Sequence, residues 1–146
     1  MKHLHTALLL VLPSLAIAQR TFDVTIADST YHMKQYWFVL YTTGPDTTQL
    51  DSSTSADLLK AHLAHQGEQA KRGLIQVGGP FGDKSNWRGL LLYDCETKEE
   101  VEGYLRQDPF VQRGKLAYDI HPWYGAIGTV LRYRGSTSAL PSIMRS

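Results

Sequence analysis

The sequence predicts an α+β domain in which four antiparallel strands form one sheet and two helices pack on one of its faces. Three observations predict this fold class. Short runs of aromatic or β-branched residues alternate with amphipathic stretches, in the order strand, helix, strand, strand, helix, strand. Glycine, proline or small polar residues separate consecutive runs. The chain has 146 residues, of which 42% are apolar, and this suits one domain with its own core.

Residues 1–18 have the pattern of a secretory signal peptide. Lys2 provides a positive charge, residues 8–12 form an apolar run, and Ala16-Ile17-Ala18 provides small residues for cleavage before Gln19. The apolar run is too short to span a bilayer. A buried N-terminal helix is the alternative, but Pro13 interrupts the run. We therefore expect an exported protein, periplasmic or extracellular, with no membrane span in the mature chain.

The charge balance argues against nucleic-acid binding, and the cysteine content excludes an intrachain disulfide. The chain has 15 basic and 14 acidic residues, and removing Lys2 with the signal peptide leaves 14 of each. Such a chain lacks the strongly positive surface that binds nucleic acid. Cys95 is the single cysteine, so no intrachain disulfide can form. No basic residue adjoins Cys95, and we expect a packed thiol there rather than a nucleophile.

The first strand of the domain is predicted at residues 36–41, which read Tyr-Trp-Phe-Val-Leu-Tyr. Residues 19–33 before it are polar and mixed, and we expect an exposed lead-in with at most one short strand. Both alternating faces of the 36–41 strand are apolar, whereas a strand with one solvated face carries polar residues there. The sheet face away from the helices therefore needs a cover. A homodimer packed sheet to sheet is the simplest solution.

The first helix is predicted to follow a loop over residues 43–53, with Thr54 or Ser55 as its N-cap and Gly73 at its C-terminal end. At about 100° per residue, His62 lies at the border of the apolar face and His65 lies about 60° further toward solvent. The residues that share the apolar face are Ala56, Leu59, Leu63, Gln66 and Ala70.

The remaining elements complete a ferredoxin-like βαββαβ order. We expect strands at residues 74–77, 87–93 and 115–121. Thr97 and Glu100 form a capping box for the second helix, which ends before Pro109. The domain is expected to span residues 34–131, with a flexible C-terminal tail over residues 132–146.

Four short motifs, in this order and on these expected elements, resemble the YCII-related domain family. The similarity runs from Tyr36 to about Trp123. Its motifs are a helix that begins His-Leu-Ala and ends at glycine, a strand that ends in Gly-Pro, an Asp-Pro-aromatic sequence followed by glycine, and a Pro-Trp pair. In this chain they are His62-Leu63-Ala64 with Gly73, Gly79-Pro80-Phe81, Asp108-Pro109-Phe110 with Gly114, and Pro122-Trp123.

The resemblance implies a dimeric α/β barrel of ferredoxin-like subunits with a conserved His–Asp pair as its active site. That pair corresponds here to His62 and Asp108. An imidazole with a carboxylate partner is a small general acid/base unit, because the carboxylate fixes the tautomer and stabilises the imidazolium. We expect Arg88 to orient an anionic substrate, although it is alternatively a strand-edge residue. The expected substrate-binding residues are Pro80, Phe81, Arg88, Phe110 and Trp123.

Function remains open between two classes. One is an exported, homodimeric acid/base enzyme of isomerase, lyase or hydrolase type that acts on a small organic molecule. The other is a non-catalytic exported dimer that binds a small ligand in the same pocket. His62 is alternatively a structural histidine bonded to a carbonyl group, and Asp108 a turn residue bonded to backbone amides. His62 and His65 with Asp108 or His121 would be a metal set, but His65 points away, so we predict neither a metal nor another cofactor.

Overall fold

The computed structural model describes residues 20–128. The expected signal peptide and C-terminal tail lie outside these residues. The described part contains five strands and three helices. In chain order they are β1 (Thr21–Ile26), β2 (Ser29–Thr43), α1 (Ser52–Lys71), β3 (Ile75–Pro80), β4 (Trp87–Tyr93), α2 (Lys98–Leu105), α3 (Pro109–Gln112) and β5 (Leu116–Ala126).

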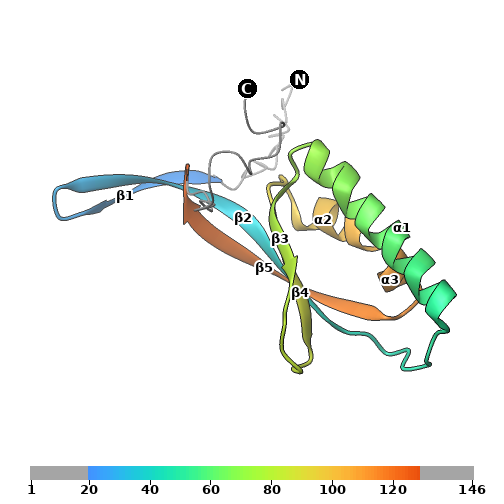
Figure 1. The fold of residues 1–146 in the computed structure, drawn as a ribbon. Coiled ribbons are helices and arrows are strands. Elements are labelled where there is room, and N and C mark those ends of the chain that lie inside the picture. The colour runs from blue at the N-terminus through green and yellow to red at the C-terminus, as the bar shows by residue number, and fades with distance from the viewer. Residues whose placement is uncertain (1–19, 129–146) are drawn as a thin grey trace, which may run out of the picture.

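All five strands form one antiparallel sheet with the helices on one face (Figure 1). Four strands lie in the order β5-β2-β4-β3, and β1 pairs with the first part of β2. The central strand β2 pairs with β4 through residues 37–42 and with β5 through residues 33–43. This order confirms the α+β, ferredoxin-like fold class, to which the structure adds a fifth strand.

The fifth strand comes from the segment that we expected to be an exposed lead-in. Its brief alternation continues across a tight turn, where Ala27 adopts a φ of 51°. Phe22 pairs with Met33 and Val24 with Tyr31, so the apolar residues of both strands share one face. The resulting β1–β2 hairpin projects beyond the helices (Figure 1). The hairpin is mostly exposed, and this agrees with its polar composition.

The start of each helix depends on which side chain accepts hydrogen bonds from the first free backbone amides. Asp51 is the N-cap of α1, since its carboxylate accepts a hydrogen bond from the Thr54 amide at 2.9 Å. The prediction of Thr54 or Ser55 as the cap was therefore wrong by one turn. Thr97 caps α2 as expected, because its hydroxyl accepts from the Glu100 amide at 3.2 Å.

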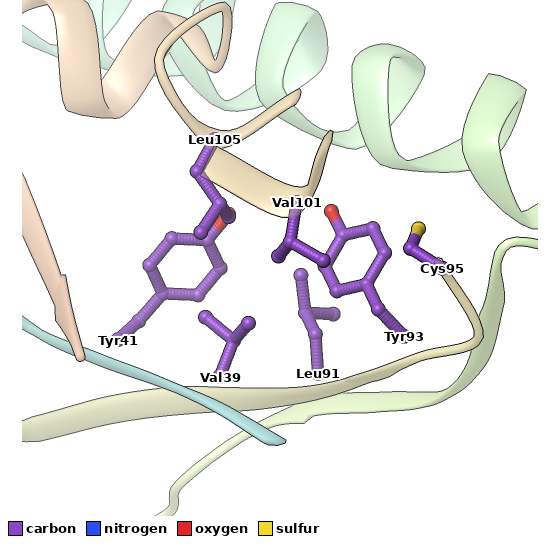
Figure 2. Close-up of a cluster of buried hydrophobic side chains, with 7 residues drawn as sticks. All are labelled: Val39, Tyr41, Leu91, Tyr93, Cys95, Val101 and Leu105. Atoms are coloured by element: carbon purple, nitrogen blue, oxygen red, sulfur yellow. The ribbon is translucent and has the colours of Figure 1, made fainter. Parts of the chain in front are cut away.

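The hydrophobic core lies between the sheet and α2 (Figure 2). Val101 and Leu105 on α2 are fully buried against side chains from β2 and β4. The whole buried cluster consists of Val39, Tyr41, Leu91, Tyr93, Cys95, Val101 and Leu105. No helix within residues 20–128 is long and apolar enough to cross a membrane. Helix α1 contains none of these cluster residues and contacts β3 and α3 instead.

Candidate active site

The His62 imidazole and the Asp108 carboxylate are in direct contact. His62 Nδ1 lies 2.8 Å from both carboxylate oxygens of Asp108. His62 is in the middle of α1, and Asp108 is the N-cap of the short helix α3, 46 residues later. The Asp108 residue is fully buried, whereas His62 keeps 9% of its surface exposed. The imidazole therefore separates a buried carboxylate from the outside.

Two further donors hold the carboxylate in place. The Tyr41 hydroxyl donates to Asp108 Oδ2 at 2.9 Å, and the Phe110 amide donates to Oδ1 at 2.9 Å. Burial by itself would raise the pKa of the Asp108 carboxyl, but the hydrogen bonds from His62, Tyr41 and Phe110 outweigh it and keep this pKa below its usual value. Burial and the Asp108 charge raise the pKa of the Tyr41 hydroxyl, which stays a donor. Asp108 is therefore an ionised, acceptor-only group.

The hydrogen-bond partners determine the tautomer of His62. An ionised carboxylate accepts and cannot donate, so Nδ1 carries the proton. On the other side of the ring, the Gln66 side-chain nitrogen lies 2.9 Å from His62 Nε2. A carboxamide nitrogen only donates, so Nε2 offers a lone pair. The ring also makes edge-on contacts with Phe110, at 4.9 Å between centroids, and Tyr41, at 6.0 Å.

A groove of about 710 Å³ lies beside His62, between α1 and the hairpin of β3 and β4. This volume is within the range of small-molecule sites. Its walls are mainly apolar, and they include Leu59, Leu63, Ile75, Leu91 and Phe110.

The apolar face of α1 forms a wall of this groove. Leu59 and Leu63 remain 47% and 56% exposed, whereas the buried residues of α1 are His62 and Gln69. We predicted His62 at the border of a buried apolar face, but the structure reverses this arrangement. The polar residues contact the protein interior because each has a hydrogen-bond partner there: Asp108 for His62, and the Tyr93 hydroxyl for Gln69.

The structure brings some of the predicted substrate-binding residues to the groove and not others. Pro80, Arg88 and Phe110 line it together with His62. Phe81 is not among the lining residues and packs against Trp87 at 5.6 Å between ring centroids. Trp123 lies elsewhere on β5, where it contacts Tyr36 on β2 at 6.0 Å between ring centroids. The Pro-Trp pair continues β5 rather than ending it, so Trp123 remains on the sheet.

His65 has a structural role. Its Nε2 lies 2.9 Å from the carbonyl oxygen of Tyr104 and donates to it, which links α1 to α2. His65 is thus in contact with backbone, not turned to solvent as predicted. Within residues 20–128, no three His, Cys, Asp or Glu side chains form a group that could bind a metal ion. Burial, Glu100 and Asp94 raise the pKa of the Cys95 thiol to about 12, so this side chain is a packed thiol.

Two residues of the site were not identified from the sequence. Tyr41 belongs to an apolar strand pattern, in which an aromatic residue is usually a core residue. Gln66 was placed on the helix face without a chemical role. Its position four residues after His62 puts the two side chains on adjacent turns, and this spacing was the available signal.

Comparison with known proteins gives one family match. The model of the YCII-related domain matches residues 36–124. Among solved structures, the chain is similar to 5-chloro-2-hydroxyhydroquinone dehydrochlorinase from Burkholderia phenoliruptrix AC1100, in complex with 2,5-dihydroxybenzoquinone. The identity is 27%, the alignment covers 60% of this chain and 92% of that chain, and the TM-score is 0.44. The comparison with curated proteins finds no match.

Proposed function

The chain belongs to the YCII-related domain family, and from this premise we propose that it is an acid/base enzyme that acts on a small organic molecule through His62 and Asp108. The observation that carries the proposal is the contact of His62 Nδ1 with both oxygens of a fully buried carboxylate, at 2.8 Å each. A histidine held in this way at the wall of a groove is equipped to accept a proton from a bound molecule.

The proton moves through His62 Nε2 in the proposed mechanism. This nitrogen takes a proton from a C–H bond of the substrate or from a water molecule, and the imidazole becomes an imidazolium. The Asp108 carboxylate stabilises that positive charge without accepting the proton, because Tyr41 and the Phe110 amide already stabilise its ionised form. The imidazolium then returns the proton to another atom of the substrate or to a leaving group. Isomerisation, elimination and water-assisted hydrolysis all fit this sequence.

Assembly and location are part of the proposal. The sheet face opposite the helices includes Tyr36, Phe38 and Leu40 on β2 beside Leu92 and Leu90 on β4. We propose that a second copy covers this apolar face and forms a sheet-to-sheet homodimer. We also propose export, on the basis of residues 1–18. Light scattering would measure the assembly, and N-terminal sequencing of the secreted protein would test cleavage before Gln19.

The experiment for the acid/base function follows proton exchange directly. The protein is incubated with a metabolite mixture in D₂O, and mass spectrometry identifies compounds that gain deuterium. We expect His62→Ala to lower the rate of incorporation by about 10²–10⁴-fold. His65→Ala is the matched control on the same helix, because His65 bonds a backbone carbonyl. Equal exchange in wild type and His62→Ala would refute the function.

A non-catalytic ligand-binding protein is the second candidate, and one observation favours it. Gln66 donates to His62 Nε2, the atom that an acid/base mechanism requires to be free. In an enzyme the substrate must displace this amide, whereas in a binding protein it can stay. We expect Gln66→Leu to increase proton exchange if the first candidate holds. If wild type and Gln66→Leu both bind a ligand but neither exchanges protons with it, the ligand-binding candidate is supported.

A further inference from the structure

We propose that the groove takes a small organic anion, whose negative group pairs with Arg88 while its apolar body lies against α1. This inference rests on the proposed function, since it names the substrate class of the same site. Its basis is the difference between the two cationic residues that line the groove, together with the absence of any acidic lining residue within the described part of the chain.

Arg88 is the extra residue of a β-bulge in β4. Tyr41 pairs with Gly89 and Thr42 pairs with Trp87, so Arg88 has no partner position on β2. Bulges redirect side chains and are frequent beside functional sites. Here the Arg88 side chain lines the groove, and its Nε–H donates to the Thr43 hydroxyl oxygen at 2.8 Å. The bulge thus gives a cation on a strand a fixed position at the groove.

The other cation of the groove is already neutralised. Lys115 Nζ lies 3.0 Å from the Asp46 carboxylate, and it also donates to the carbonyl oxygens of Asp46 and Thr48. In contrast, the terminal amino groups of Arg88 form no hydrogen bond or ion pair with any residue in the range 20–128. A guanidinium group can hold a carboxylate through two parallel hydrogen bonds. The Asp83 carboxylate acts on Arg88 only through space and forms no ion pair with it, so Arg88 is the groove cation whose terminal amino groups are open to a ligand.

The rest of the groove complements an anion with an apolar body. Its lining residues include no Asp or Glu, and the nearby Asp108 carboxylate is fully buried and bonded to His62. Leu59 and Leu63 project exposed surface into the same groove. A bound hydrocarbon portion would remove this surface from water. The site thus offers a positive charge and an apolar wall, with His62 as the group between them that can move a proton.

The test compares carboxylates with their uncharged amides. Benzoate, phenylacetate and cyclohexanecarboxylate are titrated to about 10 mM, against the corresponding amides, with binding followed by NMR on the full-length mature protein. We expect each carboxylate that binds to bind about ten- to a hundred-fold more tightly than its amide. Arg88→Met should abolish that preference. Arg113→Met is the control, because Arg113 is exposed and lies outside the groove lining.

The results also separate this inference from the proposed function. His62→Gln should keep the preference for carboxylates, which shows that Arg88 and not the imidazole supplies the charge. Equal binding of acids and amides, a preference that survives Arg88→Met in a folded variant, or no binding of any carboxylate would overturn the anion assignment. None of these results affects the D₂O experiment. Conversely, carboxylate binding without deuterium exchange would keep the anion assignment and remove proton abstraction from carbon, which is the isomerase or lyase form of the acid/base function.

Discussion

Two aspartates with lowered pKa values have different surroundings, and the difference indicates what makes a site. Asp94 accepts hydrogen bonds from Lys34 Nζ and Arg20 Nη2, at 2.6 Å each, and its side chain is 22% exposed. Asp108 is fully buried and is held by a histidine, a tyrosine hydroxyl and a backbone amide. For both, burial alone would raise the pKa, and the partners reverse the shift. A lowered pKa is therefore common to both and does not identify a catalytic group.

The charge state of the partners separates the two clusters. Arg20 and Lys34 are permanent cations, so they neutralise Asp94 at any physiological pH. The resulting cluster, which also includes Glu96, attaches the start of the β1–β2 hairpin to the turn after β4. Asp108 has no permanent cation among its hydrogen-bond partners. Its negative charge remains available to stabilise a proton on His62, and this residue faces a groove.

The largest expected effect tests this comparison through proton exchange. Asp108→Asn replaces an acceptor-only group by an amide, and all three partners of Asp108 are donors. We expect deuterium incorporation to fall by about 10²-fold or more, since the imidazolium loses its counter-charge. Asp94→Asn is the matched control and should leave the rate unchanged. Equal losses in both variants would mean that general destabilisation, and not the His–Asp contact, limits the rate.

Unfolding at low pH should show that the carboxylates of Asp94 and Asp108 both contribute to stability. Each has a folded-state pKa below the value of about 3.9 in the unfolded chain. Such a group contributes stability above the unfolded pKa, and this contribution is lost as the pH falls through the folded pKa. We expect the free energy of unfolding to decrease below about pH 4, and each Asn variant to decrease less steeply. Urea unfolding from pH 2 to 6 measures this; parallel curves for wild type and variants would contradict it.

Much of the fold was predictable because local chemistry and the tertiary structure agree. The strand at 87–93 and the Thr97 cap follow from side-chain composition alone. The β1–β2 hairpin did not follow, because its polar residues lie on an exposed arm where pairing with β2, and not burial, forms the strand. Asp51 was missed as a cap because Asp, Ser and Thr residues are adjacent there, and all are good caps.

The His–Asp pair was predictable because a motif named its residues, and Arg88 was expected near the substrate from its position at the start of the 87–93 strand. His62 and Asp108 came from the family resemblance, and the structure places them in contact. Tyr41 could not be distinguished from a core aromatic residue, since a strand pattern does not indicate which hydroxyl will meet a buried carboxylate. The bulge that positions Arg88 depends on pairing between distant strands, and nothing local in residues 86–89 specifies it.

Removal of one donor from Asp108 should have a smaller effect. Tyr41→Phe deletes the hydroxyl that donates to Oδ2 at 2.9 Å and keeps the ring in the core. We expect a loss of about 1.5–3 kcal/mol, the range for a hydrogen bond to a charged group, and a higher Asp108 pKa, while His62 and the Phe110 amide still hold the carboxylate. The acid limb of the unfolding profile should move to higher pH accordingly. In the double variant with Asp108→Asn, the stability losses should be less than additive, because both substitutions remove the same hydrogen bond.

The smallest expected effect belongs to the permanent-cation cluster. Lys34→Met removes one of the two cations on Asp94 and keeps an unbranched apolar side chain at this position. Arg20 still pairs with the carboxylate at 2.6 Å, so we expect a loss of at most about 1 kcal/mol. High salt should reduce this difference between wild type and variant, since partly exposed charges are screened, whereas the effect of Asp108→Asn should persist. Urea unfolding at low and high NaCl measures both. A Lys34→Met effect as large and as salt-independent as that of Asp108→Asn would remove the distinction between the two clusters.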